Sequence, residues 1–196
     1  MSSPPGRTGR ALRMLARRVE EASSLDTACG PLTRATGKLL TNRTLDGALG
    51  GTWLGHALHP LLTDFPLGMW MSTSYLDLIG GEDERAGAEG LLLGGIAAAL
   101  PTMAAGWRDW FHADGRARRV GIVHATVNTS AWLLYTSSYV YRRYGRHRAA
   151  MLLAVSGGVL ANVGGYLGGH LSLVLGVTLR ENQGSASRDT AAATSD

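Results

Sequence analysis

Uncharged stretches dominate the second half of the chain. Three of them, of 18, 22 and 31 residues, contain no Asp, Glu, Lys or Arg and lie between Glu89 and Arg108, between Arg119 and Arg142, and between Arg148 and Arg180. A run of 18 or more mostly apolar residues is a candidate membrane span. The pattern therefore predicts transmembrane helices at about 89–107, 120–141 and 149–169. The last helix is expected to break at Gly168-Gly169, since a helix through the whole stretch would far exceed a hydrocarbon core of about 30 Å.

A fourth span is predicted upstream, at about 60–79. Pro60 suits the first position of a helix, and the 20 residues that begin with it are enough to cross a membrane. The span contains two aspartates and Pro66, which either kinks the helix or marks its true beginning. One of the aspartates, Asp77, either faces water at the end of the span or pairs with Arg142 or Arg143.

The N-terminal quarter of the chain has a different pattern. Residues 1–10 are rich in Ser, Pro, Gly and Arg and are expected to be disordered. Apolar residues then recur at helical spacing between arginines, which predicts an amphipathic helix. The segment 11–52 is therefore either interfacial, with arginines near lipid headgroups, or cytoplasmic and packed on the rest of the domain, with a further short helix around 31–40. The polar residues 180–196 are expected to form a disordered tail.

Small residues recur every four positions in two of the spans. They are Gly90, Gly94, Ala98, Thr102 and Gly106 in one, and Gly157, Ala161, Gly165 and Gly169 in the other. Such stripes let helix backbones approach closely in lipid. The expected fold is all-α: a four-helix transmembrane bundle with up-down-up-down topology over residues 53–179, preceded by the amphipathic helix.

The distribution of arginines sets the expected orientation. With four spans, both termini and the 108–119 loop share one side, which carries most of the basic residues. The positive-inside rule places that side in the cytoplasm, although four arginines lie in the opposite 142–148 segment. We therefore expect a protein of the bacterial cytoplasmic membrane with both termini cytoplasmic. No basic face with interleaved aromatic residues indicates nucleic-acid binding.

Several kinds of chemistry are excluded by composition and motifs. The single cysteine, Cys29, leaves no internal disulfide and no site of four thiolates. The sequence contains no Gly-rich phosphate loop, no nucleophile elbow and no cysteine–histidine pair of the Rieske kind. The sequence therefore favours a protein that is not an enzyme, while a role in electron transfer stays open.

Histidines carry the clearest chemical potential. Imidazole is a common ligand of haem iron and of zinc, copper or non-haem iron. Ionisable groups inside membrane helices usually face the interior of a bundle and mark a site. Four histidines fall at the terminus-bearing end of the expected bundle, and we take them as candidate ligands of haem b or, alternatively, of a transition metal: His56, His59, His124 and His170.

Further polar residues fall in the same layer or on the same helix faces, where a carboxylate or amide can orient a ligand ring. They are Asp64, Asp109, Asn128, Asn162 and Tyr166. The alternative is a structural network in which the histidines cap helices and bond across them. Because a residue before proline disfavours helical conformation, Pro60 argues against a helical His59, and at least one of His56 and His59 is expected in a cap or loop.

Four blocks of the sequence resemble one known family. The segment WLGHALHPLLTDFPLG at 53–68 resembles the signature of a bacterial membrane family catalogued as domain of unknown function 2231. The blocks GWRDW at 106–110, RRVGIVHA at 118–125 and GYLGGHL at 165–171 are similar to its later motifs. The resemblance covers roughly residues 11–179 and implies a four-helix integral membrane protein. Some relatives carry a C-terminal Rieske iron–sulfur domain, which has no counterpart after Gly176-Val177.

Three functions are compatible with this sequence. The first is electron transfer at a histidine-lined site near the cytoplasmic face. The second is a non-catalytic membrane anchor or interaction subunit for a separate redox partner. The third is a small transporter or proton pathway that uses Asp64, Asn128 and His124. The lipid bilayer is the expected partner in each case, and a homo-oligomer stays open.

Overall fold

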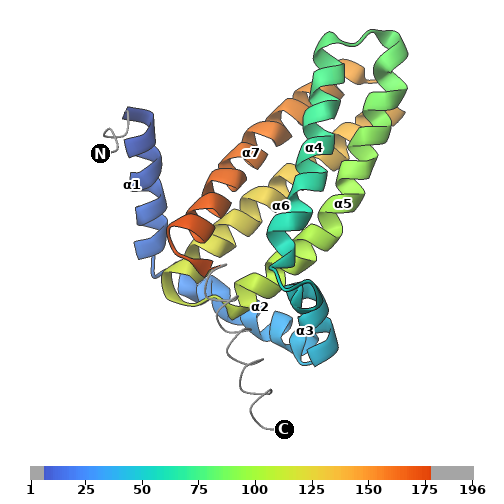
Figure 1. Ribbon diagram of the computed structural model, residues 1–196. Helices are drawn as coiled ribbons and strands as arrows, with labels where there is room; N and C mark the ends of the chain where they lie inside the picture. Colours follow the sequence, from blue (N-terminus) through green and yellow to red (C-terminus); the bar gives the residue numbers. More distant parts are fainter. Residues whose placement is uncertain (1–6, 178–196) are drawn as a thin grey trace.

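The computed structural model describes residues 7–177, which are α-helical with no strand in that range (Figure 1). Four long helices pack together: α4 (Leu58–Ile79), α5 (Arg85–His112), α6 (Gly115–Arg143) and α7 (His147–Leu173). Three shorter helices precede them: α1 (Arg7–Glu21), α2 (Leu25–Leu40) and α3 (Arg43–Gly50). The prediction of an all-α fold is confirmed, and each expected span falls inside one long helix.

The short helices gather at the end where α4 begins and α5 ends (Figure 1). There α2 contacts α5 and α6, α3 contacts α4 and α5, and α1 contacts α6. A 3-10 turn, Thr52–Leu54, joins α3 to α4, and another, Glu82–Glu84, precedes α5 at the opposite end. The chain thus places a layer of amphipathic helices against one end of the long helices.

The N-terminal region is more helical than the sequence indicated. Helix α1 begins at Arg7, so residues 7–10 are not disordered, because arginine is a good helix former and continues the amphipathic pattern. Pro31 lies inside α2 rather than in a turn. The unpredicted α3 follows Asn42, whose side chain accepts hydrogen bonds from two backbone N–H groups, a strong N-cap signal. Residues 1–6 and the predicted tail 180–196 lie outside the described residues.

Two predicted helix boundaries are wrong. Helix α4 begins at Leu58, so His59 is helical, and Pro60 lies in the first turn, where its missing N–H costs no intrahelical hydrogen bond. Pro66 lies inside α4 without ending it. Helix α7 continues through Gly168-Gly169 to Leu173, because a glycine inside a helix costs only about 1 kcal/mol relative to alanine.

Glycines bring the long helices close together in pairs. A Cβ added at Gly95 of α5 would lie 2.5 Å from Nε1 of Trp70 in α4. In the other pair, a Cβ at Gly157 of α7 would lie 3.1 Å from the ring of Tyr135 in α6. The two rings, Trp70 and Tyr135, stack with centroids 4.2 Å apart at the centre of the core. Each helix pair therefore presents a large side chain into a notch left by glycine on its neighbour.

The first half of the stripe predicted in α7, Gly157 and Ala161, is packed as expected, whereas the second half is displaced by one residue. Gly164 and Gly168 face α6, whereas Gly165 and Gly169 have no atom near enough to meet an added Cβ. Gly90 in α5 is likewise open. Small-residue spacing therefore identified the helices that approach closely, but a helical stripe of period four drifts around the axis and left the packed face undetermined.

A buried ion pair links the far ends of α4 and α6. Arg142 and Asp77 have side chains only 3% and 9% exposed. The Nη1 atom of Arg142 donates to Oδ1 of Asp77 at 2.8 Å, and Nη2 donates to the second carboxylate oxygen. Of the two alternatives for Asp77, pairing with Arg142 is confirmed.

Two helical segments of the described chain are long and apolar enough to cross a membrane, Glu82–His112 and His147–Leu173. The expected spans in α4 and α6 are not among them. Hydroxyl and amide side chains dilute the apolar character of α6, and α4 contains two aspartates and several hydroxyl groups.

Removing one partner of the buried pair should destabilise the fold strongly. We expect Asp77→Asn to lower the free energy of unfolding by about 3–5 kcal/mol, because it leaves the Arg142 charge buried and uncompensated. Denaturation of the purified protein in detergent measures this change. Arg143→Gln breaks the exposed pair with Glu89 and should cost less than about 1 kcal/mol. Equal losses of unfolding free energy in Asp77→Asn and Arg143→Gln would contradict the burial of the Arg142–Asp77 pair.

Candidate functional site

Two of the four candidate histidines meet between the long helices. His59 lies in the first turn of α4 and His124 in α6. Their ring centroids are 6.1 Å apart, and the ring planes stand at 86° to each other. Both side chains are largely enclosed by the surrounding helices. We call them the histidine pair.

Each ring of the histidine pair forms a hydrogen bond with the backbone of the next helix along the chain, His59 with α5 and His124 with α7. Nδ1 of His59 donates to the carbonyl oxygen of Thr102 in α5 at 2.8 Å. Nδ1 of His124 donates to the carbonyl oxygen of Gly164 in α7 at 2.9 Å. Because a carbonyl oxygen only accepts, both protons of the neutral rings are assigned to Nδ1. The lone pair of each neutral ring therefore lies on Nε2.

Glycines make these hydrogen bonds possible. A Cβ at Gly106 in α5 would lie 2.8 Å from Cε1 of His59, and a Cβ at Gly168 in α7 would lie 3.0 Å from Cε1 of His124. Without a side chain at these positions, each ring can lie against the backbone of the next helix. The orientation of both rings thus depends on glycine.

Asn128 is the one further predicted residue that joins the pair. Its Nδ2 donates to the carbonyl oxygen of His124 at 2.9 Å and lies 3.3 Å from both ring nitrogens of that histidine. Nε2 of His59 has no hydrogen-bond partner among residues 7–177. Among the described residues, the Asn128 amide is therefore a donor near Nε2 of His124, and no donor lies near Nε2 of His59.

The other two candidate histidines lie elsewhere. His170, at the end of α7, donates from Nε2 to Oε1 of Glu20 in α1 at 2.7 Å, with both side chains about 10% exposed or less. His56 is exposed in the segment before α4. The structure therefore divides the expected four-histidine layer into a pair, an ion-paired histidine and a surface histidine.

The remaining predicted residues do not contact the pair. Asp64 is exposed on α4, because it lies on the outer face of that helix. Asp109 accepts from Arg108 at 3.4 Å. Asn162 is exposed and donates to the carbonyl oxygen of Gly158, and Tyr166 is half-buried on the same helix.

Ion pairs at the helical layer were missed by sequence reasoning. Asp46 of α3 accepts from Arg108 at 3.0 Å and from His112 at 2.8 Å. Burial raises the pKa of the Asp46 carboxyl, but these two hydrogen bonds outweigh burial and hold the pKa below its usual range. Arg119 donates to both oxygens of Asp26, which lowers the pKa of that carboxyl. The signal in the sequence was the excess of arginines near 108–119 opposite isolated upstream aspartates.

The donor set of the described chain limits which metal sites can form. No group of three His, Cys, Asp or Glu side chains among the described residues could hold a metal ion. A structural zinc site, which needs four protein ligands, does not fit. Imidazole nitrogens are common ligands of haem iron and of transition-metal ions, and His59 and His124 are the residues that would hold such a group here.

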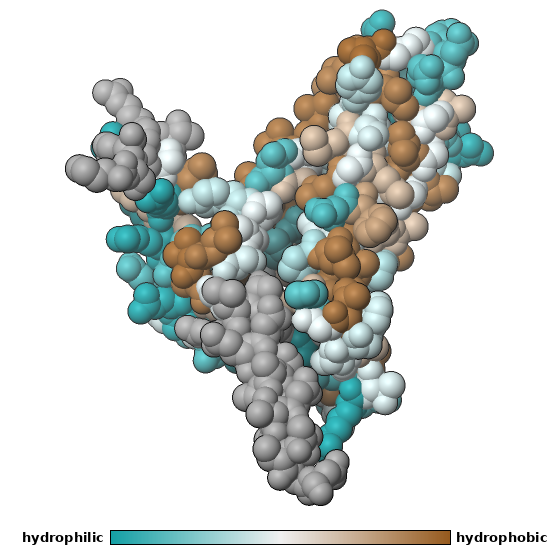
Figure 2. All heavy atoms as spheres, in the orientation of Figure 1, coloured by the Kyte–Doolittle hydropathy of each residue, from teal (hydrophilic) through white to brown (hydrophobic). Residues whose placement is uncertain are grey.

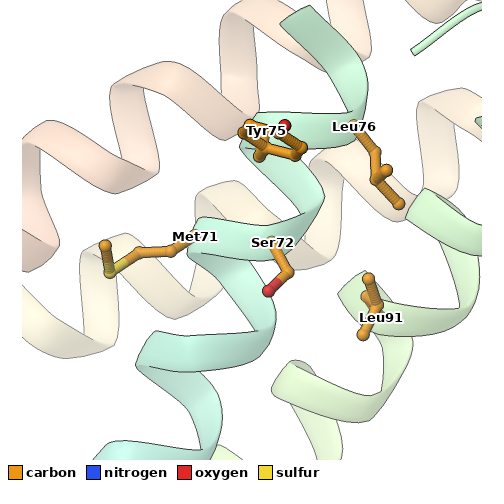
Figure 3. Close-up of a pocket in the computed structure, with 5 residues that line it drawn as sticks. All are labelled: Met71, Ser72, Tyr75, Leu76 and Leu91. Carbon is orange, nitrogen blue, oxygen red and sulfur yellow. The ribbon is translucent and has the colours of Figure 1, made fainter. Parts of the chain in front are cut away.

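A shallow groove on the outside of α4 and α5 has a different character. Its volume is about 380 Å³, and it is lined by Met71, Ser72, Tyr75, Leu76 and Leu91 (Figure 3). None of these residues is charged. The groove starts three helical turns beyond His59 along α4, so it is separate from the histidine pair.

Filling the notch beside His59 should disturb the pair. Gly106→Ala places a methyl group 2.8 Å from the ring, and we expect the resulting overpacking to cost about 1–3 kcal/mol of stability. Gly90→Ala, in open space on the same helix, should be neutral or stabilising by up to about 1 kcal/mol. Chemical denaturation of both variants checks the difference. A Gly106→Ala protein as stable as the Gly90→Ala protein would show that His59 does not rest against α5.

Comparison with known proteins places the chain in a family. The model of a predicted membrane protein family, DUF2231, matches residues 55–181, more than half of the chain. The match includes all four long helices and both members of the histidine pair. No curated protein and no solved structure matches the chain. The resemblance noted in the sequence is confirmed: the chain belongs to the DUF2231 family of predicted membrane proteins.

Proposed function

We propose that α4–α7 cross the bacterial cytoplasmic membrane as a four-helix bundle, and that His59 and His124 bind a transition-metal ion or a haem iron for electron transfer. One observation carries the proposal. Both Nδ1 atoms of the pair donate to backbone carbonyls, so the lone pair of each neutral ring lies on Nε2, and the ring centroids are 6.1 Å apart.

The outer surface of the long helices supports four spans rather than two. Figure 2 shows apolar side chains over the face in view. All four long helices expose large apolar residues: Leu61, Phe65, Met71 and Leu78 in α4, Leu93 and Leu100 in α5, Leu133 and Val140 in α6, and Leu152, Val155 and Val159 in α7. Exposed apolar surface spread over every helix of a group is typical of contact with lipid.

Polar residues in α4 and α6 are compatible with a lipid environment. Thr73 donates to the carbonyl oxygen of Met69 within α4, and Thr126 donates to that of Ile122 within α6. Ser138 of α6 donates across to the carbonyl oxygen of Ala150 in α7. Because each of these three hydroxyls finds an acceptor in the protein, it needs no water, which makes it easier for these helices to enter the membrane despite their modest hydropathy.

The burial of Arg142 supports the expected orientation, in which both termini are cytoplasmic. This arginine is buried against Asp77 and belongs to helix packing rather than to an exposed loop. The basic residues of α1, α2 and the α5–α6 turn lie at the opposite end. The positive-inside rule therefore favours a cytoplasmic location for both termini and for the end nearer the histidine pair.

The separation of the two rings suits a shared ion. A metal–imidazole bond is about 2.0–2.1 Å long, and His59 and His124, with ring centroids 6.1 Å apart, are near enough that both would hold one ion through Nε2. Carbonyl oxygens that accept from Nδ1 fix the tautomer and increase the basicity of Nε2 as a ligand. A bound transition metal or haem iron supplies one-electron chemistry, while the protein orients both ligands and limits access of water.

Two alternatives have less support from the geometry. A proton pathway would need Asp64 to contact the histidine pair, but Asp64 is exposed on the outer face of α4. A non-catalytic anchor for a redox partner is compatible with the helical layer of α1–α3, but it gives no reason for two half-buried imidazoles whose Nδ1 atoms are both held by backbone carbonyls. Electron transfer needs a donor and an acceptor, so a partner outside this chain accompanies the main proposal as well.

The visible spectrum and metal content of the purified protein test the proposal. We expect either a Soret band or a transition metal in stoichiometric amount, lost in both His59→Ala and His124→Ala. His147→Ala and His56→Ala are matched controls that should retain the cofactor, since His147 begins α7 at the other end and His56 is exposed.

The folded state of each variant is checked by its helical circular dichroism in the same detergent. Loss of the cofactor from a folded His59→Ala protein supports ligation by the pair. A wild-type protein that contains neither a chromophore nor a stoichiometric metal would overturn the proposal, as would retention of the cofactor in both pair variants.

A further inference from the structure

Three acidic residues of the N-terminal helices bind basic side chains of the long helices, whereas Glu21 of α1 is exposed. Glu20 of α1 accepts from His170 and lies 3.8 Å from Arg116. The carboxylates of Asp26 in α2 and Asp46 in α3 likewise bind basic side chains of α5 and α6. Each of these ion pairs crosses from a short helix to a long one. The carboxylates of Glu20, Asp26 and Asp46 thus face the long helices.

Cations of α1 and α2 are exposed to solvent. Six of those with described side chains have no ion-pair or hydrogen-bond partner in the described part of the chain. We call this set the basic surface: Arg10, Arg13, Arg17, Arg18, Arg34 and Lys38. Since Glu20, Asp26 and Asp46 bind other side chains, Glu21 is the one carboxylate of α1 and α2 that is exposed and not paired in this way, and the six cations leave this surface with a net positive charge.

Helix α1 also leaves its apolar strip uncovered. Ala16 and Glu20 are buried and make its contact with the long helices. Leu12 and Leu15, about a quarter turn away, are 36% and 57% exposed. In Figure 1, α1 stands at the side of the long helices with its N-terminal half diverging from them. The helix therefore combines exposed leucines with flanking arginines.

We propose that the basic surface, together with the apolar strip of α1, binds an anionic phospholipid surface. Helices with one apolar strip and arginines beside it lie in the headgroup region of a membrane, with leucines toward the acyl chains and arginines at the phosphates. Positive charge without protein partners fits the phosphodiester groups. The location of the layer, at the end of the long helices, keeps it beside the bilayer. The proposal does not depend on the histidine pair or on any cofactor.

Charge and apolar contact both contribute, so the binding is sensitive to lipid composition. Each arginine near an anionic surface shifts the equilibrium between bound and free helix by about fivefold. The attraction reaches about 10 Å at 0.1 M salt but only about 3 Å at 1 M salt. Protection of α1 from the aqueous phase should therefore require anionic lipid and disappear at high salt.

A fluorescent probe on α1 of the full chain tests this inference. An environment-sensitive probe is attached to Leu15→Cys in a Cys29→Ser background, and the protein is placed in lipid nanodiscs of phosphatidylcholine alone or of phosphatidylcholine with phosphatidylglycerol. We expect quenching by aqueous iodide to fall severalfold in the anionic discs, with a blue shift of the emission. The triple variant R13Q/R17Q/R18Q should restore quenching to the level in neutral discs.

A matched triple variant controls for loss of charge in general. R85Q/R146Q/R148Q removes three exposed arginines from the opposite end and should leave the protection of the probe unchanged. Equal quenching in the two kinds of disc would overturn the inference and leave the basic surface to an acidic protein partner. Protection that persists at high salt, or in R13Q/R17Q/R18Q, would also overturn it, because apolar packing alone would then hold α1. Neither result bears on the cofactor content of the protein.

Discussion

The contact between a large side chain and a glycine on the neighbouring helix is the interaction on which the rest of the structure depends. It recurs along both helix pairs: Trp70 lies against Gly95, Tyr135 against Gly157, and Asn128 against Gly164. Since lipid offers no hydrophobic drive to associate helices, close packing and hydrogen bonds across the contact must supply the stability. A notch of this kind lets helix backbones approach and still places a ring between them.

The histidine pair follows from the same geometry. A ring that fills a notch on a neighbouring helix also comes within reach of that helix's carbonyl groups. This is how His59 reaches Thr102 and how His124 reaches Gly164, at 2.8 and 2.9 Å. The packing that holds the helices together therefore also selects the tautomer of both imidazoles. The same glycine contact therefore both packs the helices and orients the imidazole ring.

The positions of the long helices could be predicted from the sequence because they depend on local pattern. The faces that each helix turns toward its neighbours could not, because they depend on the rotation of the helix about its axis. Uncharged runs located the long helices, and residue types at one end pointed to His59 and His124. The rotation of each helix about its axis decided the rest: Asp64 faces outward, and Gly164 rather than Gly165 faces α6. His170 was expected at the site, but its partner is Glu20, 150 residues earlier, and a pairing over that distance leaves no local pattern.

The charged side chains at the two ends of the long helices are neutralised by different partners. At the far end, Arg142 and Asp77 neutralise each other inside the protein, which costs desolvation but leaves no net charge. At the near end, carboxylates of the short helices neutralise arginines of the long ones, and the excess positive charge is moved to the outer surface. The exposed arginines of α1 and α2 can contact a charged membrane interface, whereas the Arg142–Asp77 pair fixes the far ends of α4 and α6 by packing. The asymmetry of the molecule is thus a consequence of where each carboxylate finds its partner.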